Sequence, residues 1–355
     1  MRIIALPLMG LLACAEDKAP ATSSLTTVDG TVTLEIEVGP DETAFMVTAE
    51  ASRLLATDSI TDPSGETVFY WDDWYTADSY LTAAVWPLAS DMVLNWPIRP
   101  EDAALEAGTW KVEIAALNEE GLYQDGVKVT THLQTKKDSD FTDGQIKVVI
   151  AFAEGVEEDA AVVGAIEAAV ARWEEVWAEI GLNLQVRYAT AEIESVLPYI
   201  GEGSTEVADL SEQTDSDEIL MIIGERIDAE DVYYGVSGNI PGSLITTPRS
   251  AVTISWLANS GLDGEFSTED IRLMGETMAH ETSHYMGLFH PVETSFEAWD
   301  AVRDTEKCTN AIICEEMLGG NLMFPYPVCS ALSCQPQFEL TDIQTGIAHR
   351  YTGVQ

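Results

Sequence analysis

Three of the five histidines in the chain lie within eleven residues, in the segment HETSHYMGLFH at 280–290. The preceding STED at 267–270 resembles a capping box, which predicts a helix running to about Met286. His280 and His284 are four residues apart on that helix, so both imidazoles project from one face at a separation suited to one zinc ion. The segment therefore predicts a helix that carries a metal site.

A third ligand requires the chain to turn back after the helix. Gly287 follows the second histidine by one turn, and glycine can adopt the left-handed conformation that ends a helix and reverses the chain. That turn brings His290 back to the metal, whereas a continued helix would point it away. The full pattern, HExxHxxGxxH, fixes five residues in eleven and indicates a zinc site.

Glu281 stands next to the first ligand and can reach a zinc-bound water without binding the metal. Three neutral histidines leave zinc its double positive charge and one open position, and zinc lowers the pKa of a bound water to about 7. Glu281 would take the proton of this water as it attacks a scissile carbonyl, and then deliver a proton to the leaving amine. The pattern predicts a metallopeptidase acting on a protein or peptide.

The balance of charge limits the partners of the chain. Lys and Arg number 17 against 61 Asp and Glu, so the formal net charge is 17 − 61 = −44. Nucleic acids and anionic lipid surfaces both need a basic footprint, so neither is expected to bind directly. Hydrophobic residues make up 46% of the chain, which excludes wholesale disorder.

The N-terminus predicts export. Residues 1–13 contain one cation and then an apolar run that ends in small residues, which is typical of a signal peptide. LLAC at 11–14 resembles the lipobox of bacterial lipoproteins, which makes Cys14 the predicted lipidated residue and 14–30 a polar tether. The protein is expected at the cell surface or the outer membrane, touching the membrane only through this anchor, or secreted if the signal is cut elsewhere.

Four further cysteines crowd into 27 residues near the C-terminus: Cys308, Cys314, Cys329 and Cys334. An even number at close spacing predicts two disulfides and an oxidising compartment. Three pairings are possible, and the sequence does not choose among them. A structural zinc site made by these cysteines is the alternative, but the paired CxxC spacing that such sites use is absent.

Short β-type runs fill residues 31–136 and predict an all-β sandwich domain. Turn sequences such as DPSG at 62–65 separate the runs. The runs are TVTLEIEV, AFMVTA, TVFYW, YLTAAVW, TWKVEIAAL and GVKVTTHLQT. The charged stretch at 137–144 is the predicted linker to a second domain. Its acidic residues do not follow the spacing of a calcium loop, so calcium is only a second possible cofactor beside zinc.

The hydrophobic period changes in the second domain, 145–355. IKVVIAF at 146–152 predicts a strand, and apolar residues at helical spacing over 158–180 predict a long amphipathic helix that Gly181 ends. Further strands are predicted at LNLQVRY, EILMIIG and AVTISWLA. This order favours an α/β layer. AVTISWLA at 251–258 is the candidate sheet edge for pairing with an extended substrate.

With these residues in view, the chain resembles the metzincins, zinc peptidases that combine the long zinc motif with a methionine turn beneath the metal. The resemblance covers about 143–355. It implies an α/β (α+β) catalytic domain with a twisted mixed sheet and an active-site helix, here preceded by the sandwich. It also implies three histidine ligands, Glu281 as general base and acid, and Met323 of NLMFPYP as the turn methionine.

The branch of the family stays open. NLMFPY with the later FELTDIQTGIAHRY looks like the matrixin ending, whereas VRDTEKC at 302–308 looks like the pappalysins. In astacin-like members a tyrosine two residues after the methionine assists the transition state. Pro325 holds that position here, and Tyr326 is one residue further, which makes it the candidate helper.

Two functions compete on this reading. The first is a secreted or surface-anchored zinc endopeptidase. The alternative is a surface adhesin or binding protein built on a latent or degenerate peptidase domain, which loss of Glu281 would have favoured; Glu281 is present. A non-peptide hydrolase on a similar zinc helix is a third possibility.

Overall fold

The structure is a computed structural model that describes residues 21–75, 79–87, 89–137, 141–229, 232–261, 265–330 and 333–355. The predicted signal peptide, Cys14 and the centre of the predicted linker lie outside these ranges. Within them, no helix has the length and apolar character needed to cross a membrane.

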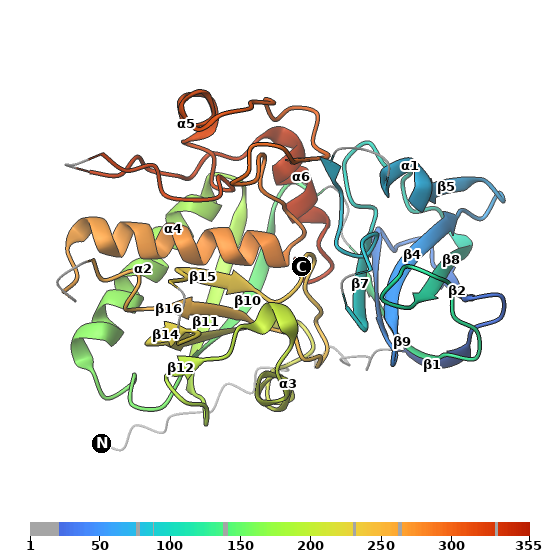
Figure 1. The fold of residues 1–355 in the computed structure, drawn as a ribbon, viewed down its shortest axis with the longest axis horizontal. Coiled ribbons are helices and arrows are strands. Elements are labelled where there is room, and N and C mark those ends of the chain that lie inside the picture. The colour runs from blue at the N-terminus through green and yellow to red at the C-terminus, as the bar shows by residue number, and fades with distance from the viewer. Residues whose placement is uncertain are drawn as a thin grey trace, which may run out of the picture.

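Two four-stranded antiparallel sheets face each other in the N-terminal half (Figure 1). The first contains, in spatial order, β1 (Ala21–Thr26), β9 (Lys128–Lys136), β3 (Ala44–Glu50) and β7 (Asp91–Trp96). The second contains β2 (Thr31–Val38), β8 (Gly108–Leu117), β4 (Leu54–Thr61) and β5 (Thr67–Tyr70), after which comes the short helix α1 (Trp71–Tyr75). Side chains from both sheets form one core.

Burial along the strands explains this arrangement. Side chains alternate between buried and exposed along β2, as expected when one face of a sheet meets a core and the other meets water. In contrast, every residue of β7 and nearly every residue of β3 is buried. Their outer face is covered by the C-terminal half, because Met46 and Val93 belong to the core of that half.

Strand β1 corrects one sequence-based expectation. Residues 14–30 are predicted to be a tether, yet Ala21–Thr26 pairs with β9 along its whole length. Five of its six side chains are exposed, because β1 is an edge strand. Small polar residues at exposed positions give no alternating pattern, so this strand has the composition of a linker.

A five-stranded sheet forms the centre of the C-terminal half. Its order is β11 (Leu182–Thr190), β10 (Gly144–Phe152), β13 (Glu218–Gly224), β16 (Val252–Ser255) and β15 (Gly235–Ser237). The first four strands are parallel, and β15 is antiparallel to β16. The strand and helix predicted at 146–152 and 158–180 are confirmed as β10 and α2 (Ala160–Ala178).

The position of the sheet edge differs from the prediction. AVTISWLA contains β16, which lies between β13 and β15 and is buried along its length. A run without charged residues that is buried on both faces therefore marks an interior strand here. The edge beside the helices is β15, a short strand of Gly235, Val236 and Ser237 that the sequence presents only as a loop.

Helix α4 (Thr268–Tyr285) carries the zinc motif and crosses α2 on one face of the sheet (Figure 1). The predicted capping box at its start is confirmed, since Ser267 and Asp270 each bond the backbone of the other. The helices approach closely at Gly275, where a Cβ would lie 2.5 Å from the carbonyl oxygen of Ala169. A side chain at this position would push α4 off α2.

The C-terminal segment returns over α4 and contains α5 (Ala311–Leu318) and α6 (Asp342–Arg350). Smaller elements complete the fold: β6 (Ser79–Tyr80), β12 (Val196–Leu197), η1 (Ile200–Glu202), α3 (Thr205–Ser211), β14 (Arg226–Ile227) and β17 (Trp299–Asp300). The two predicted disulfides are present and pair cysteines close in sequence, Cys308 with Cys314 and Cys329 with Cys334. Such bonds are typical of proteins from oxidising compartments.

Candidate metal centre

The end of α4 positions two of the three histidines and turns the chain toward the third. Gly287 has φ +108°, a conformation that side chains rarely adopt, and its N–H donates to the carbonyl of His284. Leu288 then donates its N–H to the carbonyl of Ser283 at 3.0 Å. This reversal brings His290 back to the face from which His280 and His284 project, as the sequence predicts.

The three imidazoles converge on one point. The Nε2 atom of His290 lies 3.0 Å from Nε2 of His284 and 3.3 Å from Nε2 of His280. Nitrogen atoms bound to zinc at about 2.0–2.1 Å in tetrahedral geometry are about 3.3 Å apart. The spacing of the three-histidine cluster therefore fits one tetrahedral cation with a fourth corner left over.

The Nδ1 atom of each of the three histidines faces a hydrogen-bond acceptor. Nδ1 of His280 lies 2.6 Å from the carbonyl oxygen of Leu322, and Nδ1 of His284 lies 2.6 Å from that of Leu288. Since a carbonyl only accepts, each Nδ1 must carry the proton. Nδ1 of His290 lies 3.1 Å from the carboxylate of Glu293, which also accepts. The three Nε2 atoms face one another, and in a neutral imidazole that carries its proton on Nδ1 the Nε2 atom offers the lone pair that binds a cation.

Burial favours the neutral form of the two imidazoles on α4, His280 and His284. It lowers the pKa of His280 to about 3, assisted by the nearby His290, while the hydrogen bond to Leu322 opposes the shift. Burial, with the same neighbouring histidines, also lowers the pKa of His284 well below its ordinary value. Neutral imidazole is the form that binds a metal. His280 and His284 are therefore in the metal-binding form near neutral pH.

Glu281 is buried beside the cluster and is not one of the converging ligands. Burial raises its pKa to about 8, and a hydrogen bond from the backbone of Ser237 in β15 opposes that rise. Its side chain packs on Gly235, where a Cβ would lie 2.5 Å from Cγ of Glu281. The glycine in the edge strand therefore makes room for the carboxylate.

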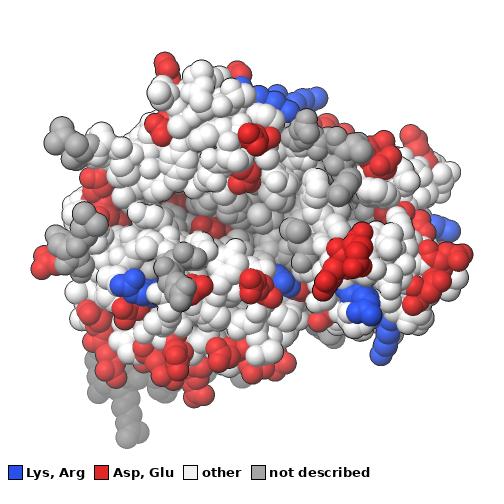
Figure 2. Space-filling view, viewed as in Figure 1, with Lys and Arg blue, Asp and Glu red and all other residues white. Residues whose placement is uncertain are grey.

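A cleft of about 320 Å³ opens over Glu281 and His280. One wall is the segment that leads into β15, the floor is α4, and the other wall is the turn that contains Pro325. Its lining residues are Val232, Tyr233, Tyr234, Gly235, Leu273, Glu276, Thr277, His280, Glu281, Leu322, Phe324, Pro325, Tyr326, Pro327 and Gln337. Figure 2 shows this face of the molecule hollowed between the C-terminal segment and the sheet.

Met323 follows Leu322, whose carbonyl accepts a hydrogen bond from His280, and it is fully buried in the core of the C-terminal half. Its N–H donates to the side chain of Asn321, which in turn donates to Gln344 of α6 at 2.8 Å. Tyr326 lies in the wall of the cleft, and its hydroxyl donates to Glu315 of α5 at 3.1 Å. In this conformation the tyrosine hydroxyl is engaged away from the histidines.

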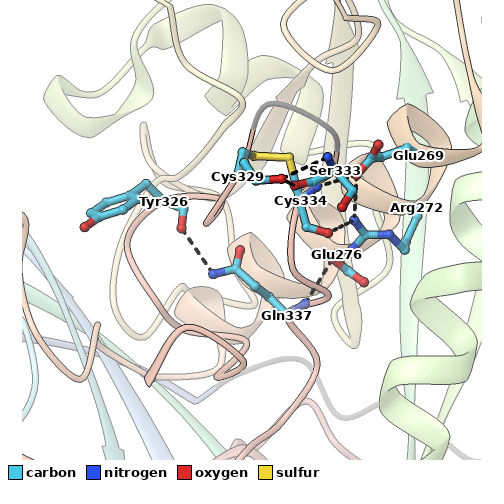
Figure 3. Close-up of a disulfide and its surroundings, with 9 residues drawn as sticks. Glu269, Arg272, Glu276, Tyr326, Cys329, Ser333, Cys334 and Gln337 are labelled. Atoms are coloured by element: carbon cyan, nitrogen blue, oxygen red, sulfur yellow. Dashed lines mark hydrogen bonds and ion pairs between the residues drawn. A yellow bond between two sulfur atoms is a disulfide. The ribbon is translucent and has the colours of Figure 1, made fainter. Parts of the chain in front are cut away.

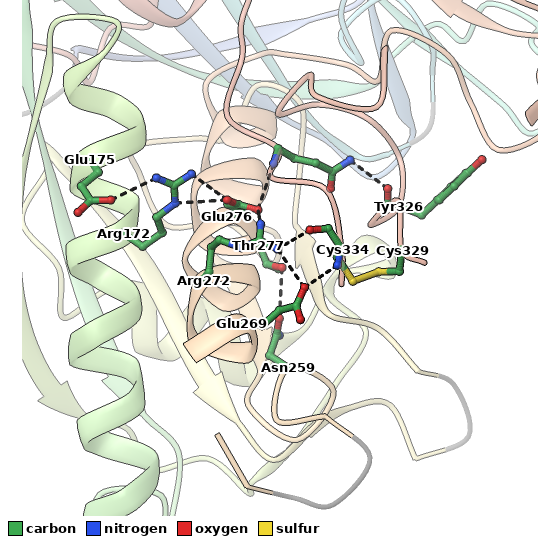
Figure 4. Close-up of polar contacts among 11 residues, drawn as sticks. Arg172, Glu175, Asn259, Glu269, Arg272, Glu276, Thr277, Tyr326, Cys329 and Cys334 are labelled. Atoms are coloured by element: carbon green, nitrogen blue, oxygen red, sulfur yellow. Dashed lines mark hydrogen bonds and ion pairs between the residues drawn. A yellow bond between two sulfur atoms is a disulfide. The ribbon is translucent and has the colours of Figure 1, made fainter. Parts of the chain in front are cut away.

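Glu276, one turn before His280, joins α4 to its surroundings (Figure 4). Its buried carboxylate accepts from Arg172 of α2 at 2.8 Å, from Arg272 at 2.6 Å and from the N–H of Gln337 at 3.1 Å. Figure 3 shows the Cys329–Cys334 disulfide above the same helix, where Cys334 accepts from Arg272 at 2.9 Å. These contacts hold the C-terminal segment over the floor of the cleft.

Several features of the site leave no readable signal in the sequence. Leu288 and Leu322 act through their backbone carbonyls, which every residue type has, so the sequence does not single them out. The need for glycine at position 235 becomes clear only when the structure places β15 against Glu281. Glu293 is the exception, since a carboxylate three residues after a ligand could have been noted as a partner for its ring. In the described ranges, the three histidines are the one group of at least three converging His, Cys, Asp or Glu side chains, and calcium as a second cofactor stays a prediction.

The other two histidines lie elsewhere. His132 of β9 hydrogen-bonds Thr22, and Nε2 of His349 donates to the carbonyl of Ile180 at 2.7 Å. Neither belongs to the three-histidine cluster.

Comparison with known proteins adds little. No protein-family model matches the chain, and no curated protein matches it. Among solved structures, a family two carbohydrate esterase from Clostridium thermocellum aligns over 59% of this chain and 63% of its own, with 9% identity and a TM-score of 0.16. A salicylyl-acyltransferase aligns over 56% and 48%, with 15% identity and a TM-score of 0.14.

A ruminal endo-beta-1,4-mannanase aligns over 80% of this chain and 61% of its own, with 10% identity and a TM-score of 0.17. The chain therefore spans less than two thirds of the length of each of these structures. At such TM-scores the alignments carry no argument about fold or function.

Proposed function

We propose that this chain is a zinc-dependent endopeptidase of the metzincin type. The observation that carries the proposal is the convergence of three imidazoles beside a buried carboxylate. The Nε2 atom of His290 lies 3.0 Å from that of His284 and 3.3 Å from that of His280, and Glu281 is buried next to them. Three nitrogen donors suit zinc, and leave a coordination position for water or substrate. The HExxHxxGxxH motif and the buried Met323, which follows the hydrogen-bond partner of His280, support membership of the metzincin family.

The chemistry follows from the residues around the cluster. When bound, the metal would supply a Lewis acid and lower the pKa of water. Glu281 would accept the proton of the attacking water and donate it to the leaving amine. Burial raises the pKa of Glu281, and a neighbouring dication would lower it toward the range of a general base.

The substrate would bind as an extended peptide. Strand β15 ends the sheet on the side of the cleft, so the outer backbone groups that are not bonded to Glu281 can pair with another strand. This edge runs past Glu281, which packs on Gly235. A peptide bound along β15 would pass its backbone over the metal. We further propose that the protein is exported and held at the membrane by a lipid on Cys14.

Replacement of Glu281 by glutamine tests the proposal. The variant should bind zinc like the wild type and lose casein cleavage by at least about 100-fold, because the general base is removed while the ligands stay. Glu206→Gln, which changes an exposed glutamate on α3, should cleave normally. A zinc-loaded wild type that cleaves no member of a peptide library would contradict the proposal and favour a binding protein instead.

A further inference from the structure

The third ligand reaches the metal from a loop that both halves of the molecule share. We call residues 287–300, from the glycine turn to the end of β17, the ligand loop. Within it, Val292 pairs with Trp299, and Glu293 accepts an N–H from Phe296 at 2.8 Å, so the loop forms a small hairpin. On one side, Val292 packs against the Cys308–Cys314 disulfide and Phe324.

The other side of the ligand loop rests on the N-terminal sandwich. Strand β17 pairs in parallel with β6, which places Trp299 opposite Ser79 and Asp300 opposite Tyr80. Ala301 then donates its N–H to the carbonyl of Tyr80 at 2.7 Å, and its side chain packs against the sandwich core. The next residue, Val302, belongs to the core of the C-terminal half.

An aromatic stack lies directly beside the ligand. The rings of Tyr80 and Phe289 are 5.4 Å apart and nearly parallel, at 14°. Phe289 is the residue before His290, so the stack contacts the chain immediately before the ligand. Tyr80 is itself held by Trp86, whose ring lies 5.8 Å away. The segment that carries Tyr80 is anchored to the catalytic half, since Ala83 donates to the carbonyl of Ile240 at 2.8 Å.

We infer that the sandwich domain is a structural part of the metal site, with Tyr80 as the positioning residue for His290. The inference rests on the proposed metal centre and extends it: the sandwich completes the site by fixing its third ligand. Without the stack, His290 would sample orientations in which Nε2 points away from the other two nitrogens, and the cation would lose a ligand for part of the time.

Zinc affinity of the full-length chain, measured by competition with a chromophoric chelator, tests this. Tyr80→Ala should weaken zinc binding by about 10-fold, in the range found when the support of a ligand is removed. Tyr80→Phe keeps the stacked ring and should bind zinc like the wild type. Tyr123→Ala, which removes a tyrosine that hydrogen-bonds Asp58 within the sandwich, should also bind zinc normally.

A second variant guards against loss of folding in Tyr80→Ala. Phe289→Leu removes the other ring of the stack and should weaken zinc binding to a similar extent. The double variant should be no weaker than either single one, because both remove the same interaction. The visible spectrum of the cobalt-loaded variants should show the loss of one nitrogen ligand, which a general decrease in stability would not produce.

The outcomes separate the inference from the proposed function. A wild type with no measurable zinc affinity overturns both. A wild type that binds zinc, together with folded Tyr80→Ala or Phe289→Leu that bind it equally well, overturns the inference alone.

Discussion

At the scale of single residues, the site depends on small side chains as much as on its ligands. Gly235 is one such position, because a Cβ there would lie 2.5 Å from Cγ of Glu281 and 3.0 Å from Cδ1 of Ile254. Its backbone does not need a left-handed conformation, so the requirement is one of space. Neither the zinc motif nor the local sequence indicates this constraint.

Gly235→Ala should therefore displace the carboxylate and leave the metal in place. We expect peptide cleavage to fall by about 10- to 100-fold, because small displacements of reacting groups are costly, while zinc content stays unchanged. Gly164→Ala is the matched control, since a Cβ there meets open space on helix α2. It should cleave normally and gain about 0.5–1 kcal/mol of stability. If Gly235→Ala cleaved peptides at the rate of the wild type, the carboxylate of Glu281 would not need the space that Gly235 leaves.

Asp300, which is not part of the three-histidine cluster, should make the stability of the protein depend on pH. It is 3% exposed, and burial raises the pKa of its carboxyl to about 7, although hydrogen bonds from Thr305 and Val302 oppose the shift. The folded protein holds this proton over a pH range in which the unfolded chain has released it. The contribution to stability is therefore present at low pH and lost as the pH rises from about 4 through 7.

Asp300→Asn imitates the protonated form and should remove this dependence. Its free energy of unfolding should match the wild type near pH 4 and exceed it at pH 8 by up to about 4 kcal/mol, at about 1.4 kcal/mol per pKa unit. Denaturant unfolding at several pH values measures the difference. Asp41→Asn, at an exposed position, should follow the wild type throughout. If the free energies of unfolding of Asp300→Asn and the wild type changed with pH in parallel, the folded protein would not hold a proton on Asp300 over this range.

At the scale of elements, Glu276 fixes α4 against α2 and the C-terminal segment. Glu276→Ala would leave Arg172 and Arg272 without their shared buried partner, and we expect it to cost about 3–5 kcal/mol of stability. Glu175→Ala is the control, because Glu175 pairs with the same Arg172 but is 69% exposed. Its loss should cost no more than about 1 kcal/mol. If Glu276→Ala and Glu175→Ala lowered the free energy of unfolding by similar amounts, measured with denaturant, Glu276 would have no central role in holding α4.

The sequence predicted the elements that have a strong hydrophobic period or a cap. Strand β10, helix α2 and the capping box of α4 follow from local patterns, because burial on one face repeats every two or 3.6 residues. Strands β1 and β15 were missed because they are edge strands with small, polar or glycine residues. The pairing of β6 with β17 joins residues about 220 positions apart, and no local pattern reports such a contact.

At the scale of the whole molecule, the sandwich and the C-terminal half share buried polar contacts. Lys136, which is 1% exposed, donates to the carbonyl of His349 at 2.7 Å. The side chain of Asn95 bonds both the carbonyl of Arg350 and the N–H of Thr352. Buried groups of this kind are costly when left without partners, so separating the two halves would destabilise both.

The metal-free protein should therefore unfold in one transition. Calorimetry of the full chain should give a single peak whose calorimetric and van't Hoff enthalpies agree. Asn95→Ala, which breaks contacts between the halves, should lower the melting temperature or split the peak. Two separate transitions in the wild type would show that the sandwich folds independently of the metal site.

The central claim is that three imidazoles hold one zinc ion with a position left open. X-ray absorption at the zinc edge, on the full-length protein loaded with one equivalent of zinc, tests it most directly. The account predicts three imidazole nitrogens and one further light atom at about 2.0–2.1 Å. A first shell with fewer than three imidazoles, or one dominated by sulfur, would contradict it.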